Sequence, residues 1–245
     1  MTEFIGQNVP LESLPSKGKP YPDDIEIYVK PLTIKEQMEM DTYGVTTAEY
    51  FNVLLRGITV RGAFDKRELL FHDVQFLDLV RRLFTFDTEQ EIQVKDVICQ
   101  DCGHTFNGAF KFNQIEFTDF AEDAFEQRYT FSDGLTITCQ PMTIGKFIRA
   151  GRKYFSTKKL NVADIYLGYF VLCVTNVEGR EFKNEEAMQD FLYDYFGNLY
   201  MAKDKKILDE LDEKSASVIV PLKLTCPKCG EIVEVAVNPS YQFQQ

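Results

Sequence analysis

The pattern Cys-x-x-Cys-Gly occurs twice in this chain, first as Cys99–Gly103 and again as Cys226–Gly230. A two-residue gap lets both thiolates of one copy reach the same ion, at about 2.3 Å for zinc, and the glycine takes a backbone conformation that a β-carbon resists. Two such knuckles supply the four ligands of a closed tetrahedral site, which leaves no open position for catalysis. We therefore predict one structural zinc site with four ligands, Cys99, Cys102, Cys226 and Cys229.

The separation of the two knuckles is the difficulty for this prediction. Residues 103–225 lie between them, far more than in an ordinary zinc ribbon. Either the chain folds back, or each knuckle binds something else. An internal repeat favours the return. The segment YPDDIEIYVKPLTI (21–34) matches FSDGLTITCQPMTI (131–144) without a gap, with the proline, a threonine and three Ile/Leu positions in register.

The order of predicted elements also repeats after the matched segments. In the first half we expect a strand at 25–29, helices opened at 33–36, 46–49 and 65–68, and strands on both sides of the first knuckle. In the second half Asn161 and Asn184 open helices, Val218–Leu224 leads into the second knuckle, and Val233–Val237 leads out. The wider spacing of the second half places net insertions around 150–162 and 200–215.

The expected fold class is α+β, with an internal duplication of strand, helices, strand, zinc knuckle and strand. Duplicated units tend to pack about a pseudo-two-fold axis, which would bring the knuckles together around a shared zinc-ribbon-like site. The ion would then clamp the halves to each other. The expected boundaries are an extended Pro-rich arm at 1–24, a first repeat at 25–113, a connector at 114–130 and a second repeat at 131–245.

Two interpretations of the N-terminal segment stay open. Its core, LPSKGKPYP (14–22), contains three prolines and a glycine and so excludes a helix or a central strand. It could extend along a partner, or it could cover its own domain.

Composition narrows the class of protein. Hydrophobic residues make up 44% and charged residues 27%, as in soluble globular chains. No apolar run approaches about 18 residues and no signal-peptide pattern begins the chain, so we expect no membrane segment. Six cysteines without such a signal favour metal binding in a reducing compartment over disulfides. A net charge of −11 disfavours binding to phosphate backbones.

The remaining candidate residues favour structural roles. Cys139 and Cys173 are expected to be small core residues, and His104 is a less favoured substitute zinc ligand. His72 beside Asp73 is expected at a solvated helix end. The basic stretch Lys146–Lys159 is either a solvated face or a contact for an acidic partner or nucleic acid; it contains Lys146, Arg149, Arg152, Lys153, Lys158 and Lys159. No nucleotide-binding or hydrolase motif occurs, so we expect no enzymatic activity.

At this point several motifs carry a resemblance. LPSKGKPYP, then VKPLT (29–33), then D-V-x-F-L-x-x-x-R-R (73–82) and the two knuckles resemble the baseplate hub assembly family of T-even-type contractile-tailed bacteriophages. The resemblance implies a non-enzymatic tail protein that helps to build the baseplate hub. Its partners would be other tail and baseplate proteins, in the virion or in the host cytoplasm during assembly. Members of the family keep only some of the cysteines, so zinc is not implied as their general function.

Two other functions remain open. A zinc-ribbon protein that binds nucleic acid or regulates expression would need basic and aromatic residues around the knuckles. The residues found there are mixed to acidic: Asp96, Asp101, His104, Lys223, Lys228, Glu231 and Glu234. A tail chaperone, absent from mature particles, is the third possibility.

Overall fold

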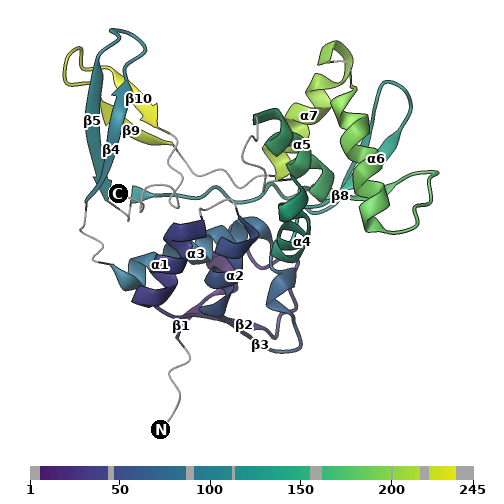
Figure 1. Cartoon of the computed structure of the whole chain (residues 1–245), viewed down its shortest axis with the longest axis horizontal. Coiled ribbons are helices and arrows are strands. Elements are labelled where there is room, and N and C mark those ends of the chain that lie inside the picture. The colour runs from purple at the N-terminus through teal and green to yellow at the C-terminus, as the bar shows by residue number, and fades with distance from the viewer. Residues whose placement is uncertain are drawn as a thin grey trace.

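Two three-stranded antiparallel sheets, each accompanied by helices, form the body of the molecule (Figure 1). The computed structural model describes residues 6–43, 47–86, 91–111, 114–154, 162–199, 201–215 and 221–235. In each sheet the second strand along the chain lies in the centre. The first sheet contains β1 (Gln7–Val9), β2 (Glu26–Val29) and β3 (Ile58–Arg61), and the second contains β6 (Gln127–Thr130), β7 (Thr136–Cys139) and β8 (Val174–Val177). The mixture of helices and small antiparallel sheets confirms the α+β class.

Two of the three helices of the first half, α1 (Ile34–Tyr43) and α2 (Ala48–Arg56), begin at the predicted caps. Thr33 and Glu36 form a reciprocal capping box: the Glu36 N–H donates to Thr33 Oγ1 at 3.2 Å, and the Thr33 N–H donates to Glu36 Oε2 at 2.9 Å. Thr47 accepts a hydrogen bond from the Tyr50 N–H. The other helical elements are the 3-10 turn η1 (Leu11–Ser13), the 3-10 turn η2 (Lys66–Glu68) and α3 (Phe71–Thr85).

Two details of this half were predicted wrongly. The spacing of Tyr50, Leu54, Gly57 and Ile58 predicts one apolar stripe on a helix. The helix instead ends at Arg56, and Ile58 begins β3, opposite Val29 of β2. Asp65 does not open the third helix. It caps η2, and α3 begins only at Phe71.

The second half repeats this element order and adds one helix. Two strands, two helices, a strand, a helix and a final hairpin follow one another in both halves. Asn184 caps its helix by accepting a hydrogen bond from the Ala187 N–H at 2.9 Å, as predicted. The helices are α4 (Ile144–Tyr154), α5 (Val162–Cys173), α6 (Glu185–Gly197) and the additional α7 (Met201–Ser215). The predicted cap at Asn161 lies outside the described residues.

One hydrophobic core runs through both halves. Phe147 of α4 packs on Phe71 and Phe51, with ring centroids 4.6 and 5.1 Å away. Each such ring, when fully buried, contributes roughly 1.5–3 kcal/mol. Backbone hydrogen bonds reinforce the contact, because the Phe71 N–H donates to Met142 O and the Ile144 N–H donates to Leu69 O. Hydrophobic packing and backbone hydrogen bonds therefore join the two halves, independently of any contact between the knuckles.

The N-terminal segment covers its own domain within the described residues. β1 pairs with β2, Leu14 is fully buried, and the Tyr21 hydroxyl donates to the Asp73 carboxylate in α3. Lys17 forms an ion pair with Asp119 at 2.8 Å. This placement of residues 6–24 corresponds to the second of the two interpretations of the N-terminal segment.

Several polar residues lie deeper than the sequence suggests. His72 and Asp73 are 5% and 0% exposed, so the predicted solvated helix end is wrong. The residues that surround them explain the burial: His72 Nε2 lies 2.9 Å from Tyr169 Oη, and Asp73 is bonded by the Ser16 N–H and by Tyr21. The segment predicted as a connector contains β6, which pairs with β7.

The two knuckles stand at the tips of β-hairpins that form a separate unit (Figure 1). Their strands are β4 (Glu91–Ile98) and β5 (Thr105–Lys111), and β9 (Leu222–Thr225) and β10 (Ile232–Val235). The hairpins share a small core of Val94, Val97, Phe110 and Leu222, to which α3 contributes Leu79. Of the predicted strand positions, Val218, Val220 and Val237 lie outside the described residues. Within the described residues, no helix combines the length and apolar character needed to cross a membrane.

Candidate metal centre

Four cysteine sulfurs from the two hairpins meet at one point. The Sγ atoms of Cys99, Cys102, Cys226 and Cys229 all lie within 4.8 Å of one another. Two of the separations cross between hairpins: Cys99 to Cys229 is 3.6 Å and Cys102 to Cys226 is 3.8 Å. A tetrahedron with metal–sulfur bonds of about 2.3 Å has edges of about 3.8 Å. The four thiols therefore have the donor set and the spacing of a zinc site with four cysteine ligands.

Both knuckles use the same backbone geometry. The Cys99 N–H donates to His104 O and the Gly103 N–H donates back to Cys99 O; in the second knuckle Cys226 bonds Glu231 and Gly230 bonds Cys226 in the same way. The glycines have φ of +65° and +79°, and a β-carbon on either would meet no atom within 4 Å. Glycine is thus required by the left-handed backbone rather than by space.

The two cysteines of each knuckle differ in exposure. The first one, Cys99 or Cys226, is 1% exposed, whereas Cys102 is half-buried and Cys229 is exposed. The first cysteine continues the inward-facing side of its strand, and the second lies in the turn. The packed hairpin strands therefore fix the sulfurs of Cys99 and Cys226, and the turns position the sulfurs of Cys102 and Cys229 beside them.

The crowded thiols perturb each other's protonation. Burial raises the pKa of Cys226, but hydrogen bonds from the Cys229 and Lys228 backbone, with help from neighbouring thiols, lower it to about 7. At Cys229 a backbone hydrogen bond from Glu231 lowers the pKa, but the adjacent sulfurs raise it to about 12. The first thiol of the cluster therefore loses its proton readily, and its negative charge opposes deprotonation of the next, as expected where several thiols lie close together. A divalent cation would relieve this repulsion because it binds thiolates.

The structure does not bring the other candidate residues to this site. His104 follows the first knuckle and its ring stacks beside Phe106, but it is not part of the cluster of ligand atoms. Cys139 and Cys173 are buried in the large core, where burial raises the pKa of the Cys139 thiol. They behave as small core residues, as predicted.

The basic stretch Lys146–Lys159 is described only at its start. Lys146 and Arg149 of α4 both lie 3.8 Å from the Glu185 carboxylate of α6. The side chains of Arg152, Lys153, Lys158 and Lys159 lie outside the described residues. The part that is described therefore neutralises an acidic residue of the same chain.

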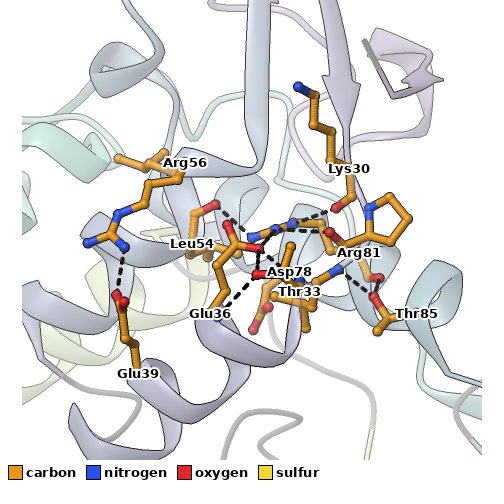
Figure 2. A network of polar contacts seen from close by, with 12 residues as sticks. Lys30, Thr33, Glu36, Glu39, Leu54, Arg56, Asp78, Arg81 and Thr85 are labelled. Atoms are coloured by element: carbon orange, nitrogen blue, oxygen red, sulfur yellow. Dashed lines mark hydrogen bonds and ion pairs between the residues drawn. The ribbon is translucent and has the colours of Figure 1, made fainter. Parts of the chain in front are cut away.

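A second cluster of buried polar residues surrounds Arg81 and Arg82, and the sequence did not predict it. Arg81 of α3 is fully buried and donates to three backbone carbonyls: Lys30 O at 2.8 Å, Leu54 O at 3.0 Å and Pro31 O at 3.5 Å (Figure 2). Its Nη2 also lies 3.3 Å from the Glu36 carboxylate. Beside it Arg82 bonds Asp78 and Tyr50, which bond each other. The pair Arg81-Arg82 stands out in the sequence because it belongs to a motif that carries the family resemblance. No feature of the sequence indicated that the two side chains are buried.

The comparison with known families agrees with that resemblance. A family model described as T4 bacteriophage base plate protein matches residues 7–241. The match covers nearly the whole chain, so the chain belongs to the T4 bacteriophage base plate protein family. No curated protein and no solved structure matches the chain. Membership implies a structural protein of the phage baseplate, located in the virion tail and in contact with other tail proteins. The family description does not single out the hub.

Proposed function

We propose that this baseplate protein is a structural component or assembly factor of the baseplate hub, and that it acts through protein–protein contacts stabilised by a structural zinc ion. The observation that carries the metal assignment is the cluster of four sulfurs from two hairpins, with separations of 3.6 and 3.8 Å across the pair. Four protein ligands would fill the coordination sphere of zinc, so the ion would supply stability and no reaction site.

We further propose that the chain arose by duplication, with repeats at 25–113 and 131–245, a connector at 114–130 and an N-terminal segment at 1–24. Three features support this: the matched segments 21–34 and 131–144, the repeated element order, and the identical hydrogen bonds of the two knuckles. In this arrangement each repeat supplies one knuckle and two ligands. A shared ion then explains why motifs so far apart in the sequence are similar.

The location of the zinc defines what it stabilises. The ion would sit at the tips of two short hairpins whose shared core is small, whereas the large core joins the repeats independently. Apparent zinc binding energies of about 10–16 kcal/mol are known for small sites, enough to order such hairpins. The ion would thus clamp the two hairpins into one rigid projection.

The nucleic-acid alternative is less well supported. Asp96, Asp101 and Glu231 surround the knuckles, and Lys223 pairs with Glu234 at 3.9 Å. Binding of DNA or RNA that weakens with salt would support the alternative. A chaperone role predicts that the protein is found in lysates of infected cells but is missing from purified particles.

Zinc per chain, measured by elemental analysis on the wild type and on Cys226→Ser, tests the metal assignment. We expect one zinc in the wild type and a loss of most of it in the variant. Cys139→Ser is the matched control and should keep its zinc, because Cys139 lies in the large core. One zinc per chain retained by Cys226→Ser would contradict a shared site.

Complementation tests the baseplate assignment separately. A phage that lacks the gene should produce no complete tails, as counted by electron microscopy, and wild-type protein should restore them. Normal tails in the absence of the protein would overturn the assignment to the baseplate hub, whatever the zinc content.

A further inference from the structure

A groove runs along the zinc-bearing hairpins, between β4 and β10, and has a volume of about 640 Å³. Its walls are formed by consecutive residues, 94–101 on one side and 231–235 on the other. Successive side chains of a strand point to opposite faces, so a groove over one face would be lined by alternate residues. Lining by consecutive residues indicates that this groove follows the edges of the strands, where backbone groups are accessible.

The edges that line the groove are not paired to a further strand in the described part of the chain. Each hairpin is a two-stranded sheet, with β4 paired to β5 and β10 paired to β9. Figure 1 shows β4 and β10 as neighbouring strands of the hairpin unit. An accessible edge is a template for another extended chain, which adds by main-chain hydrogen bonds.

The side chains in the groove define the chemistry of such a chain. Ile98 and Ile232 are 55% and 57% exposed, and both belong to the groove walls. They would cover apolar side chains at alternate positions of an added strand. Charged residues in the walls comprise one lysine, Lys95, and four carboxylates, Asp96, Asp101, Glu231 and Glu234, of which Glu234 is partly neutralised by Lys223. Charge complementarity therefore favours a basic partner.

β4 is bent at the groove. The register with β5 shifts between Val94 and Val97, and Asp96 has φ of +56° with its N–H bonded to the Asn107 side chain. Val94 and Val97 both remain in the small core. The bulge therefore keeps the apolar side of β4 inward and leaves Lys95 and Asp96 outside it. Such irregularities end one pairing and re-aim side chains toward another.

We propose that the groove between β4 and β10 binds an extended segment of another tail protein, about five residues long, with apolar side chains at alternate positions and lysine or arginine between them. The length corresponds to that of the shorter groove wall, residues 231–235. This inference rests on the proposed baseplate function, which supplies the partner. Zinc would hold both walls of the groove in place.

Site-specific photocrosslinking during phage assembly tests the proposal. The photoreactive residue p-benzoyl-phenylalanine replaces Ile232 in one variant and Ile34 in the control, since Ile34 is 83% exposed but lies on α1. Mass spectrometry of purified tails then identifies the crosslinked peptide. We expect the Ile232 variant to yield one partner segment with alternating apolar residues and a net positive charge, and the Ile34 variant not to yield it. Crosslinks to an acidic segment, to a second copy of this chain, or to the same peptide from both positions would overturn the proposal.

A charge variant separates this proposal from the baseplate function itself. Ile232→Lys removes one of the two exposed apolar side chains of the groove walls and adds a positive charge that would repel a basic segment, and Ile34→Lys is the matched control. We expect Ile232→Lys to reduce complete tails at least tenfold while zinc content is unchanged. Wild-type tail numbers with Ile232→Lys, in a phage that still requires the protein, would refute the groove and leave the baseplate function intact.

Discussion

Replacement of Arg81 by methionine is expected to lower the free energy of unfolding by about 3–5 kcal/mol, the cost of leaving a buried charge or several buried acceptors without a partner. The guanidinium is fully buried and serves Lys30 O, Leu54 O, Pro31 O and the Glu36 carboxylate (Figure 2). Methionine fills a similar volume but donates no hydrogen bond. The loss is a large share of the 5–15 kcal/mol typical of a domain.

Arg56 provides a matched control, because it also forms an ion pair with a glutamate of α1. It pairs with Glu39 of α1 at 2.6 Å, but its side chain is 56% exposed. Exposed pairs contribute about 0–1 kcal/mol, so Arg56→Met should change stability little. Urea unfolding of both variants and the wild type in a buffer that contains zinc, followed by circular dichroism, measures both losses. A loss for Arg81→Met within 1 kcal/mol of that for Arg56→Met would refute the role assigned to the buried guanidinium.

A substitution at Gly57 tests the role of the buried Arg81 guanidinium without removing its charge. A β-carbon at Gly57 would lie 2.0 Å from Arg81 Cζ and Nη2, so Gly57→Ala must displace the guanidinium from its acceptors. We expect Gly57→Ala to destabilise the wild type strongly but to cost much less when Arg81 is already methionine. Equal costs in the two backgrounds would show that Gly57 matters for some other reason.

Other buried or constrained groups give three more predictions. Burial lowers the pKa of His72 to about 3, from about 6.5 in the unfolded chain. Because the unfolded state then binds the extra proton, the free energy of unfolding falls as the pH drops below 6.5, by about 2 kcal/mol at pH 5. His72→Gln should reduce this pH dependence in urea titrations, and an unchanged pH dependence would contradict the assignment. Tyr21→Phe should cost about 1–3 kcal/mol and expose residues 6–24 to proteases, because Asp73 and the Leu70 N–H lose a buried partner, whereas Tyr28→Phe, at an exposed bond to Glu26, should be neutral. Gly230→Ala should weaken zinc retention against a chelator because φ there is +79°, at a cost of about 1–2 kcal/mol, and unchanged retention would refute the role of that backbone conformation.

The parts of the fold that could be predicted from sequence are those fixed by local chemistry. The capping box at Thr33 and the cap at Asn184 depend on residues three positions apart, and the knuckle turns depend on a single glycine each. The clustering of the four cysteines was also correctly predicted, because the repeat implied that the hairpins meet.

The short strands could not be predicted in the same way. β1 has three residues and β3 has four, too few for a period-2 pattern to stand out, and their pairing with β2 is decided by tertiary packing. The burial of Asp73 and Arg81 was missed because charged residues are rarely buried unless they are paired. Two of their partners, Ser16 and the Lys30 carbonyl, are 57 and 51 positions away in the sequence.

Three of the motifs that carry the family resemblance converge on α3. The segment LPSKGKPYP reaches Asp73 through Ser16 and Tyr21, and VKPLT reaches Arg81 through the Lys30 carbonyl. These three motifs thus fix one helix against the first sheet, and none of these contacts involves one of the four clustered cysteines. This frame around α3 therefore does not depend on the four clustered cysteines.

The same helix connects the frame to the unit formed by the two hairpins that carry the cysteine cluster. Leu77 of α3 belongs to the large core, whereas Leu79 belongs to the small core beneath the hairpins. Removal of zinc should therefore disorder the hairpins and the groove between β4 and β10 first, while the frame around α3 stays folded. The metal would control the surface that contacts other tail proteins more than it controls whether the chain folds, which is why zinc content and tail assembly have to be measured separately.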